Sequence, residues 1–437
     1  MGIYKIGIKL MKSQRKDNIF YMITILVSTA LIFNMINILN IKGSGFNNII
    51  ERTILSMPVL IIILLICFLI FYTNNYLGKL KSKDIAIQLL SGVNVFKLGI
   101  SLAMQSSILT FISYILGILF GLLLVPIFCL LAKSDGIYLL SSEAFIYSLL
   151  IMVVEFLFIS VVNIGYGYRN SITDLINDEE RDSYIRDNSK KRGLSIKDFR
   201  FFIYTFLSLI FLFMPQDKME ENLTYILLIF CLTIYGSIQI INVFIPKHVD
   251  KIKSKYFNNK IKIIAINNVK TKIIKNKIIS FLIFSTSVSV IFSMQVVSSF
   301  EKFNLYNRIT FIINIVLIAF MIIYRGLYDA TNEKNTLNSL ILIGYKKSEI
   351  EDIIKTEFKY FYSAFLGAPF LMIFMYLMIL LIKGILDGIF VLSYILIYIS
   401  IMSITVFITY FFTMKVMENN NLKRVKSNVC YRSEKCN

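Results

Sequence analysis

The chain has 437 residues, of which 57% are hydrophobic, with a mean hydropathy of +0.70 and a formal net charge of +19. A soluble protein of this length could not bury so much apolar surface, so this composition excludes the ordinary soluble classes. The apolar segments are continuous and do not alternate with polar residues, which argues against a membrane barrel. The composition predicts an all-α, polytopic integral membrane protein.

Ten segments are apolar enough to cross a membrane, whose hydrocarbon core of about 30 Å requires about 20 helical residues. They lie at 19–38, 54–73, 101–131, 144–166, 200–214, 223–245, 278–299, 309–324, 358–382 and 388–413. The fifth segment is short. The third and ninth are longer than a bilayer requires, which predicts that these two helices tilt or extend beyond it.

The distribution of basic residues predicts the orientation, because cytoplasmic connections carry an excess of Lys and Arg. With the N-terminus inside, 39 of the 46 basic residues fall in cytoplasmic connections and 7 fall outside. We therefore expect a multi-pass plasma-membrane protein with both termini in the cytoplasm. Because the charge lies beside the spans, anionic lipids at the cytoplasmic face explain it better than nucleic acid does.

One short stretch recurs in the second half of the chain. Residues 81–100 read KSKDIAIQLLSGVNVFKLGI, and residues 333–352 read EKNTLNSLILIGYKKSEIED. Each stretch predicts a short amphipathic helix that a glycine stops before a long span. The residues that form this pattern are Ile85, Leu89, Leu90 and Gly92 in the first copy, which align in that order with Leu337, Ile341, Leu342 and Gly344 in the second. The two copies are 252 positions apart, and residues anywhere in the two halves with that separation are called equivalent below.

A second similarity extends the repeat. IGIKLMKSQRKDNIFYMI at 6–23 aligns with IAINNVKTKIIKNKIISFLI at 264–283 as a basic lead-in to a span. The chain then divides into a four-span repeat at 1–170, a charged linker with two central spans at 171–258, and a second four-span repeat with a basic tail at 259–437. Both repeats have the same orientation, so the repeat is parallel.

The sequence contains no recognisable catalytic constellation. There is no G-x-x-x-x-G-K-[ST], HExxH or CxxC motif, and a single histidine, His248, excludes a cluster of histidine metal ligands. We therefore expect that the chain is not an enzyme and holds no cofactor. Its energy would come from an ion gradient or from another chain.

Glu155 lies deep in the fourth span, within SLLIMVVEFLFISVV. It is a proton or cation site, a polar hinge, or a carboxyl that is neutral or bonded to a neighbouring helix. We favour the last interpretation, because the sequence offers no Lys, Arg or Asp deep in a span as a partner.

Three residues in the long spans predict features of helix packing. Gly117 and Gly121 form a G-x-x-x-G motif, which allows close approach of helices either within the chain or in a dimer. Pro369 predicts a kink in the ninth span.

The stretch between spans two and three resembles the coupling element of the FtsX/MacB-like permeases of ABC transporters. In that family the segment reads E-I-G-[IL]-[LM]-[RK]-[AS]-[LI]-G-[AY], and here it reads DIAIQLLSGV at 84–93 and LILIGYKKSEI at 340–350. Glu357, at the start of span nine, matches an acidic residue usual in the family. Ten spans with one such unit at each end resemble the BceB subgroup, although SFEKFNLYN stands where that subgroup has a large extracellular domain.

The resemblance implies the permease subunit of an ABC transporter. Two copies of a separate ABC ATPase, which would bind ATP and Mg, would dock on 81–97 and 333–350. The implied cargo is an antimicrobial peptide or a lipid-linked cell-wall intermediate, and a sensor histidine kinase is a further implied partner. Two alternatives remain open: a signalling scaffold that transports nothing, and a gradient-driven carrier that uses Glu155.

Overall fold

Every regular element in the described part of the computed structural model is a helix, as the composition predicts. Long apolar runs form helices in lipid because each backbone N–H and C=O must find its hydrogen bond within its own segment. The residues that the structure describes are 15–40, 49–131, 139–169, 203–204, 206, 223–240, 245–256, 258–296, 301–384 and 386–433.

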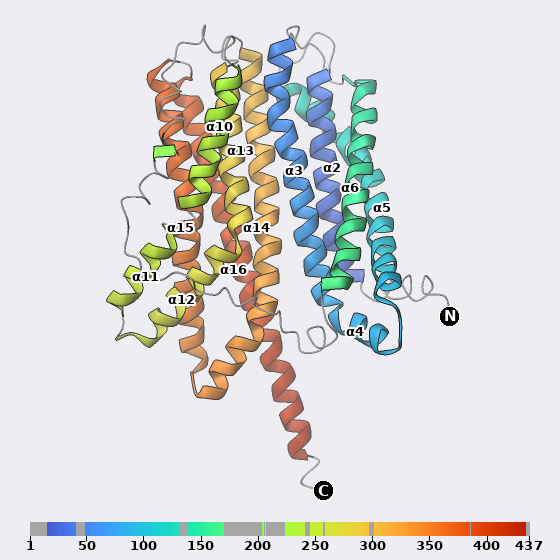
Figure 1. The fold of residues 1–437 in the computed structure, drawn as a ribbon, viewed down its shortest axis with the longest axis vertical. Helices are drawn as coiled ribbons and strands as arrows, with labels where there is room; N and C mark the ends of the chain where they lie inside the picture. The colour runs from blue at the N-terminus through green and yellow to red at the C-terminus, as the bar shows by residue number, and fades with distance from the viewer. Residues whose placement is uncertain are drawn as a thin grey trace.

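The first half of the chain forms one bundle. Its helices are α2 (Arg15–Asn40), α3 (Ile49–Leu80), the short α4 (Ser82–Leu90), α5 (Val95–Leu131) and α6 (Ser142–Arg169). α2 packs against α5 and α6, and α5 also packs against α6. This bundle appears in blue to green in Figure 1.

The second half forms a bundle of four long helices. They are α13 (Lys277–Val296), α14 (Glu301–Ile343), α15 (Lys347–Ile382) and α16 (Gly388–Ser433). α14 packs against α13 and α16, and α15 packs against α13 and α16. The second half therefore also forms a helix bundle.

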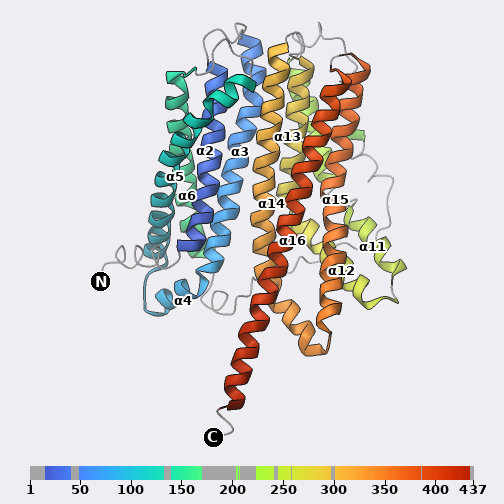
Figure 2. The ribbon, with the colours of Figure 1, turned by 180° about the vertical axis from the view of Figure 1, so that it is seen from behind.

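Between α6 and α13 the structure describes three helices: α10 (Leu223–Gln239), α11 (Ile245–Lys255) and α12 (Lys260–Lys275). The Asn259 side chain caps α12 by accepting a hydrogen bond from the Lys262 N–H at 3.2 Å. α12 packs against α11 and α15. Figure 2 shows α11 and α12 beside the lower part of α15.

The two bundles meet along α3 and α14, which run side by side at the centre in both views (Figures 1 and 2). Two thirds of the apolar windows of α2 and α14 are buried, 67% in each, against 22% for α6 and 28% for α16. α2 and α14 therefore form the interior, whereas α6 and α16 turn most of their apolar side chains outward, as contact with lipid requires.

Seven helices in the described part of the chain are long and apolar enough to cross a membrane, which makes the chain a multi-pass membrane protein. They match the first four and the last three of the ten expected spans. The expected span at 278–299 falls on α13, and that at 223–245 falls on α10, which has 17 residues. The expected span at 200–214 lies outside the described residues apart from 203, 204 and 206.

The two segments that contain the predicted glycine stops lie at the same end of the molecule. α2 begins and α16 ends there, and α4 and the junction between α14 and α15 lie there as well (Figure 1). We name it the turn end, after the turns at Gly92 and Gly344.

Candidate functional site

A glycine turn stops α4 at the turn end. Gly92 has a φ of 85°, a conformation that side-chain-bearing residues adopt only with strain. Its N–H donates to the Leu89 carbonyl at 3.0 Å, and the Val93 N–H donates to the Gln88 carbonyl at 3.2 Å. These two bonds form a Schellman motif, which satisfies carbonyls that a helix end leaves open.

The junction between α14 and α15 repeats this geometry in the second half. Gly344 has a φ of 106°. Its N–H donates to the Ile341 carbonyl at 3.0 Å, and the Tyr345 N–H donates to the Leu340 carbonyl at 3.1 Å. Each donor and each acceptor is equivalent to its counterpart in the first turn, so both glycines end helices in the same way.

The helices that lead into the two turns differ. α4 is separated from α3 at Lys81. The stretch before Gly344, in contrast, continues α14 without a break as far as Ile343. The expectation of a separate short helix before Gly344 is therefore wrong. The sequence offers no proline or glycine between Gly326 and Gly344 that would stop the helix earlier.

The apolar face expected on α4 is divided between the interior and the surface. Ile85 is 2% exposed and packs with Ala86 and with Leu98 of α5, and Leu89 packs against the same cluster. Leu90 is 64% exposed. The three aliphatic residues predicted to share one face therefore do not present a common outer surface.

Exposed aliphatic side chains nevertheless flank both turns. Ile87 is 64% exposed on α4. At the end of α14, Ile341, Leu342 and Ile343 are 41%, 79% and 74% exposed. The side chain of Leu337 lies outside those that the structure describes.

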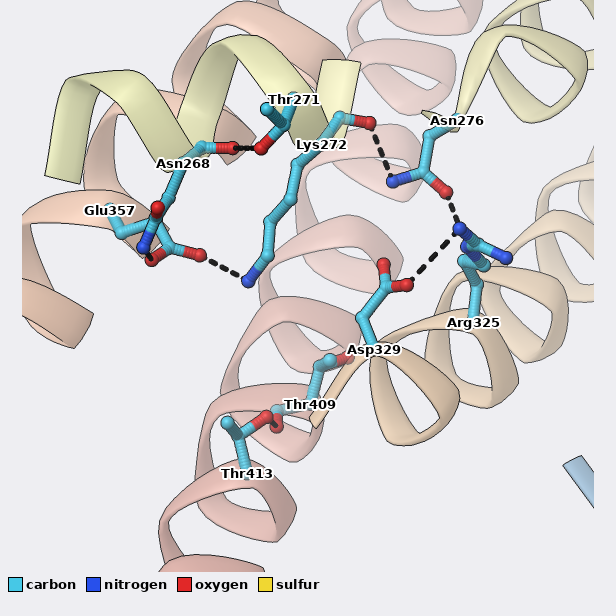
Figure 3. Close-up of polar contacts among 9 residues, drawn as sticks. All are labelled: Asn268, Thr271, Lys272, Asn276, Arg325, Asp329, Glu357, Thr409 and Thr413. Atoms are coloured by element: carbon cyan, nitrogen blue, oxygen red, sulfur yellow. Dashed lines mark hydrogen bonds and ion pairs between the residues drawn. The ribbon is translucent and has the colours of Figure 1, made fainter. Parts of the chain in front are cut away.

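A buried ion pair fixes α12 on α15 near the turn end (Figure 3). The Lys272 ammonium of α12 pairs with the Glu357 carboxylate of α15, and their side chains are 11% and 3% exposed. The Asn268 side-chain amide donates to the other Glu357 oxygen at 3.0 Å. Burying a charge is costly unless it is paired and hydrogen-bonded. Any shift of α12 that separated this pair would therefore be unfavourable.

A second set of contacts joins α12, α13 and α14. The Arg325 Nε donates to the Asn276 side-chain oxygen at 2.8 Å, and its Nη2 lies 3.1 Å from the Asp329 carboxylate. The Asn276 amide donates to the Lys272 carbonyl at 2.9 Å. The Arg325 guanidinium lies 5.8 Å from the ring centroid of Tyr72 on α3. Polar contacts thus extend from the second bundle to the central helix of the first.

A small pocket lies between the two ion pairs. Its polar lining comes from Lys272, Asp329, Glu357, Tyr362 and Thr413. Figure 3 shows Thr409 and Thr413 below these charges on α16, where each hydroxyl donates to a carbonyl of its own helix at 2.7 Å. The Lys272–Glu357 and Arg325–Asp329 pairs place paired charges beside the pocket, and its lining comes from α12, α14, α15 and α16.

In the first half a neutral glutamine takes the place of the buried carboxylate. Gln105 is equivalent to Glu357 and is 5% exposed. The Lys81 ammonium donates to the Gln105 side-chain oxygen at 3.3 Å. Lys81 lies at the break between α3 and α4, whereas Lys272, the lysine of the second half, lies on α12.

The sequence analysis found Glu357 by family resemblance and missed its partners. Lys272 stands far before it in the chain, so only the packing of α12 on α15 brings the two together. One local signal existed: Lys272 occupies the buried stripe of α12, whose other members are Ala265, Ile266, Val269 and Ile273. A charge within an apolar stripe points to a buried partner.

Glu155 lies at the middle of α6 and is 2% exposed. Neither of its carboxyl oxygens has a hydrogen-bond partner among the described residues. The titratable side chains near enough to interact with its charge include Tyr21 of α2, Cys67 of α3 and Tyr114 of α5. Since none of these groups is a cation, the geometry favours the neutral acid.

The G-x-x-x-G motif packs α5 against α2 within the chain. A Cβ at Gly117 would lie 1.7 Å from the Thr29 hydroxyl, and one at Gly121 would lie 3.2 Å from the Phe33 ring. Pro369 is buried inside α15, which continues as a helix from Lys347 to Ile382.

Comparison with known proteins does not assign the chain to a family. No model of a known protein family matches the chain. No curated protein matches it significantly. The structure itself defines the class: an all-α, multi-pass membrane protein whose turn end carries two equivalent glycine turns and a buried ionic cluster.

Proposed function

We propose that the chain is the permease subunit of an ABC transporter of the FtsX/MacB-like kind. Its ten spans would follow the arrangement of the BceB subgroup without the large extracellular domain, as two parallel four-span repeats at 1–170 and 259–437 with two spans between. A separate ABC ATPase, present in two copies, would bind ATP and Mg and carry out hydrolysis. The permease would lie in the plasma membrane with both termini in the cytoplasm.

The observation that carries this proposal is the repetition of one turn geometry. Gly92 and Gly344 have positive φ, make the same pair of hydrogen bonds and lie at the same end of the molecule. Two equivalent turns suit a symmetric pair of partner subunits. The exposed side chains of Leu90 and Leu342, which are also equivalent, are suited to enter an apolar groove on each subunit.

The central helices support the parallel repeat. Tyr72 of α3 and Tyr324 of α14 are equivalent residues, and they are 5% and 4% exposed. Their helices pack against each other, and the Tyr324 ring lies 6.3 Å from that of Tyr76 on α3. Contact between equivalent helices at the centre is what a repeat related by a two-fold axis would produce.

The arrangement of the helices offers a path for movement. Each turn leads directly into one of the long helices of its bundle, α5 with 37 residues and α15 with 36. Closure of the ATPases would push on both turns and so shift α5 and α15. In the second half the Lys272–Glu357 pair would carry α12 along with α15. The cargo suggested by the resemblance is an antimicrobial peptide or a lipid-linked cell-wall intermediate.

The proposal is tested by placing one charge beside each turn, in the variants Leu90→Glu and Leu342→Glu. A fully buried aliphatic side chain contributes about 1.5–3 kcal/mol before ordering costs, and a carboxylate adds a desolvation cost. Each substitution should weaken co-purification with a candidate partner ABC ATPase about tenfold or more. The double variant should abolish it, together with the stimulation of ATP turnover.

The matched control is Asn258→Glu, which adds the same charge at an exposed position between α11 and α12. It should bind the ATPase as the native chain does. Normal binding and ATP turnover by a correctly inserted double variant would refute the docking of an ATPase on these turns. Two alternatives would then be favoured. A gradient-driven carrier should need Glu155 for transport, whereas a signalling scaffold should be needed for the response of a sensor kinase.

A further inference from the structure

The buried face of α6 carries three polar side chains among apolar ones, although most of the helix is turned toward lipid. Ser148, Glu155 and Asn163 are 5%, 2% and 7% exposed. Successive members of this set are about two helical turns apart, so the three side chains lie on one stripe. The stripe faces into the bundle that α6 forms with α2, α3 and α5.

Two members of this stripe have hydrogen-bond partners on α5. The Asn163 amide donates to the Ser106 hydroxyl at 3.1 Å. The hydroxyls of Ser148 and Tyr114 are 3.4 Å apart. Buried polar groups are normally satisfied in this way, so the bonds at both ends of the stripe are ordinary helix-to-helix contacts.

Glu155 lies between these two contacts and differs from Ser148 and Asn163 in its hydrogen bonding. Neither carboxyl oxygen has a hydrogen-bond partner among the described residues. The titratable groups near enough to interact with its charge include one from each packed helix, Tyr21, Cys67 and Tyr114. Tyr21 is engaged with the Thr110 hydroxyl at 3.1 Å. A phenol or a thiol is uncharged near neutral pH, so none of the three balances a carboxylate.

From this geometry we infer that Glu155 is a proton-binding site within the first bundle. It holds a proton as the neutral acid while α2, α3, α5 and α6 are packed around it, because an unpaired carboxylate is too costly in that environment. When the bundle opens, the O–H bond of the carboxyl breaks, water accepts the proton, and the carboxylate remains. Opening of the first half is thereby coupled to release of one proton.

The inference does not depend on an ATPase and is tested on the full chain alone in lipid nanodiscs. Infrared spectra of the native chain and of Glu155→Gln are compared at neutral pH. We expect the native chain to show a band of a protonated carboxylic acid that the variant lacks. Glu143→Gln, which changes an exposed carboxyl at the start of the same helix, should retain that band.

The pH dependence of thermal unfolding gives a second readout. In the unfolded chain a glutamate loses its proton above about pH 4.3, whereas in the closed bundle Glu155 keeps it. The native chain should therefore lose stability relative to Glu155→Gln as the pH rises above that value, by about 1–2 °C for each pH unit. Glu155→Met, which is also neutral, should abolish the dependence in the same way.

Two results would overturn the inference. One is a native spectrum at neutral pH that shows no acid band lost in either neutral variant. The other is a difference in unfolding midpoint that stays constant with pH. Either result would show that Glu155 is ionised in the closed bundle, whatever the outcome of the experiments with the ATPase.

Discussion

Lys272 illustrates how one side chain positions a helix. It lies among aliphatic residues on the buried side of α12, where a lone ammonium would be costly. Glu357 and Asn268 supply the compensating charge and hydrogen bond. The Lys272 ammonium also lies 5.7 Å from the centre of the Phe358 ring, a cation–π contact within the same site.

Removal of one partner of this pair should therefore destabilise the protein strongly. Lys272→Met leaves the Glu357 carboxylate buried and uncompensated, which costs about 3–5 kcal/mol in comparable cases. Unfolding of the purified protein by a denaturing detergent should report the loss. Lys355→Met, which removes an exposed lysine from α15, should change stability by less than about 0.5 kcal/mol.

The charge-reversed pair distinguishes a specific contact from general sensitivity of the site. Lys272→Glu and Glu357→Lys should each be severely destabilising, and the two together should recover much of the loss. A double variant as unstable as the sum of the single variants would show that the two side chains do not interact directly.

At the scale of elements, the contact between α2 and α5 depends on the absence of a side chain. A Cβ at Gly117 would lie 1.7 Å from the Thr29 hydroxyl and 2.9 Å from the Leu26 carbonyl oxygen. The hydroxyl can rotate, but the backbone carbonyl cannot move without shifting α2. The packing of α5 on α2 therefore requires glycine at this position.

Gly117→Ala should lower the unfolding midpoint of the first bundle, since α5 must move away from α2. Gly165→Ala is the matched control, because nothing lies within 4 Å of a Cβ there. That control should be neutral or stabilising by up to about 1 kcal/mol, as alanine favours a helix. Equal effects of the two substitutions in a thermal or denaturant assay would contradict the packing of α5 on α2.

The sequence predicts the helices better than it predicts which of their side chains are buried. Seven spans and both glycine stops follow from local features: an apolar run, and a residue able to adopt positive φ. The burial of Ile85 and Leu89 does not follow, because tertiary packing decides it. For the same reason the sequence offered Glu155 and Glu357 as candidates without their surroundings.

For the whole molecule, the distribution of basic residues predicts that the turn end faces the cytoplasm. Single cysteines at Ser91 and Lys346 would report on the turn end, and those at Ser142 and Asp387 on the opposite end, since all four residues are exposed. In a chain without its five native cysteines, an impermeant thiol reagent added to intact cells should label only the latter two. Labelling of position 346 from outside would invert the topology.

The contact between α3 and α14 has a consequence for how the protein is made. Tyr72 on α3 and Tyr324 on α14 lie in opposite halves of the chain, and the ribosome adds about 5–20 residues each second. At that rate α3 waits on the order of 10–50 s in the bilayer before its partner is synthesised. During that interval lipid, or a membrane chaperone, has to cover the face of α3 that α14 later occupies. Assembly of the two halves is thus a late step of biogenesis, sensitive to whatever occupies that face first.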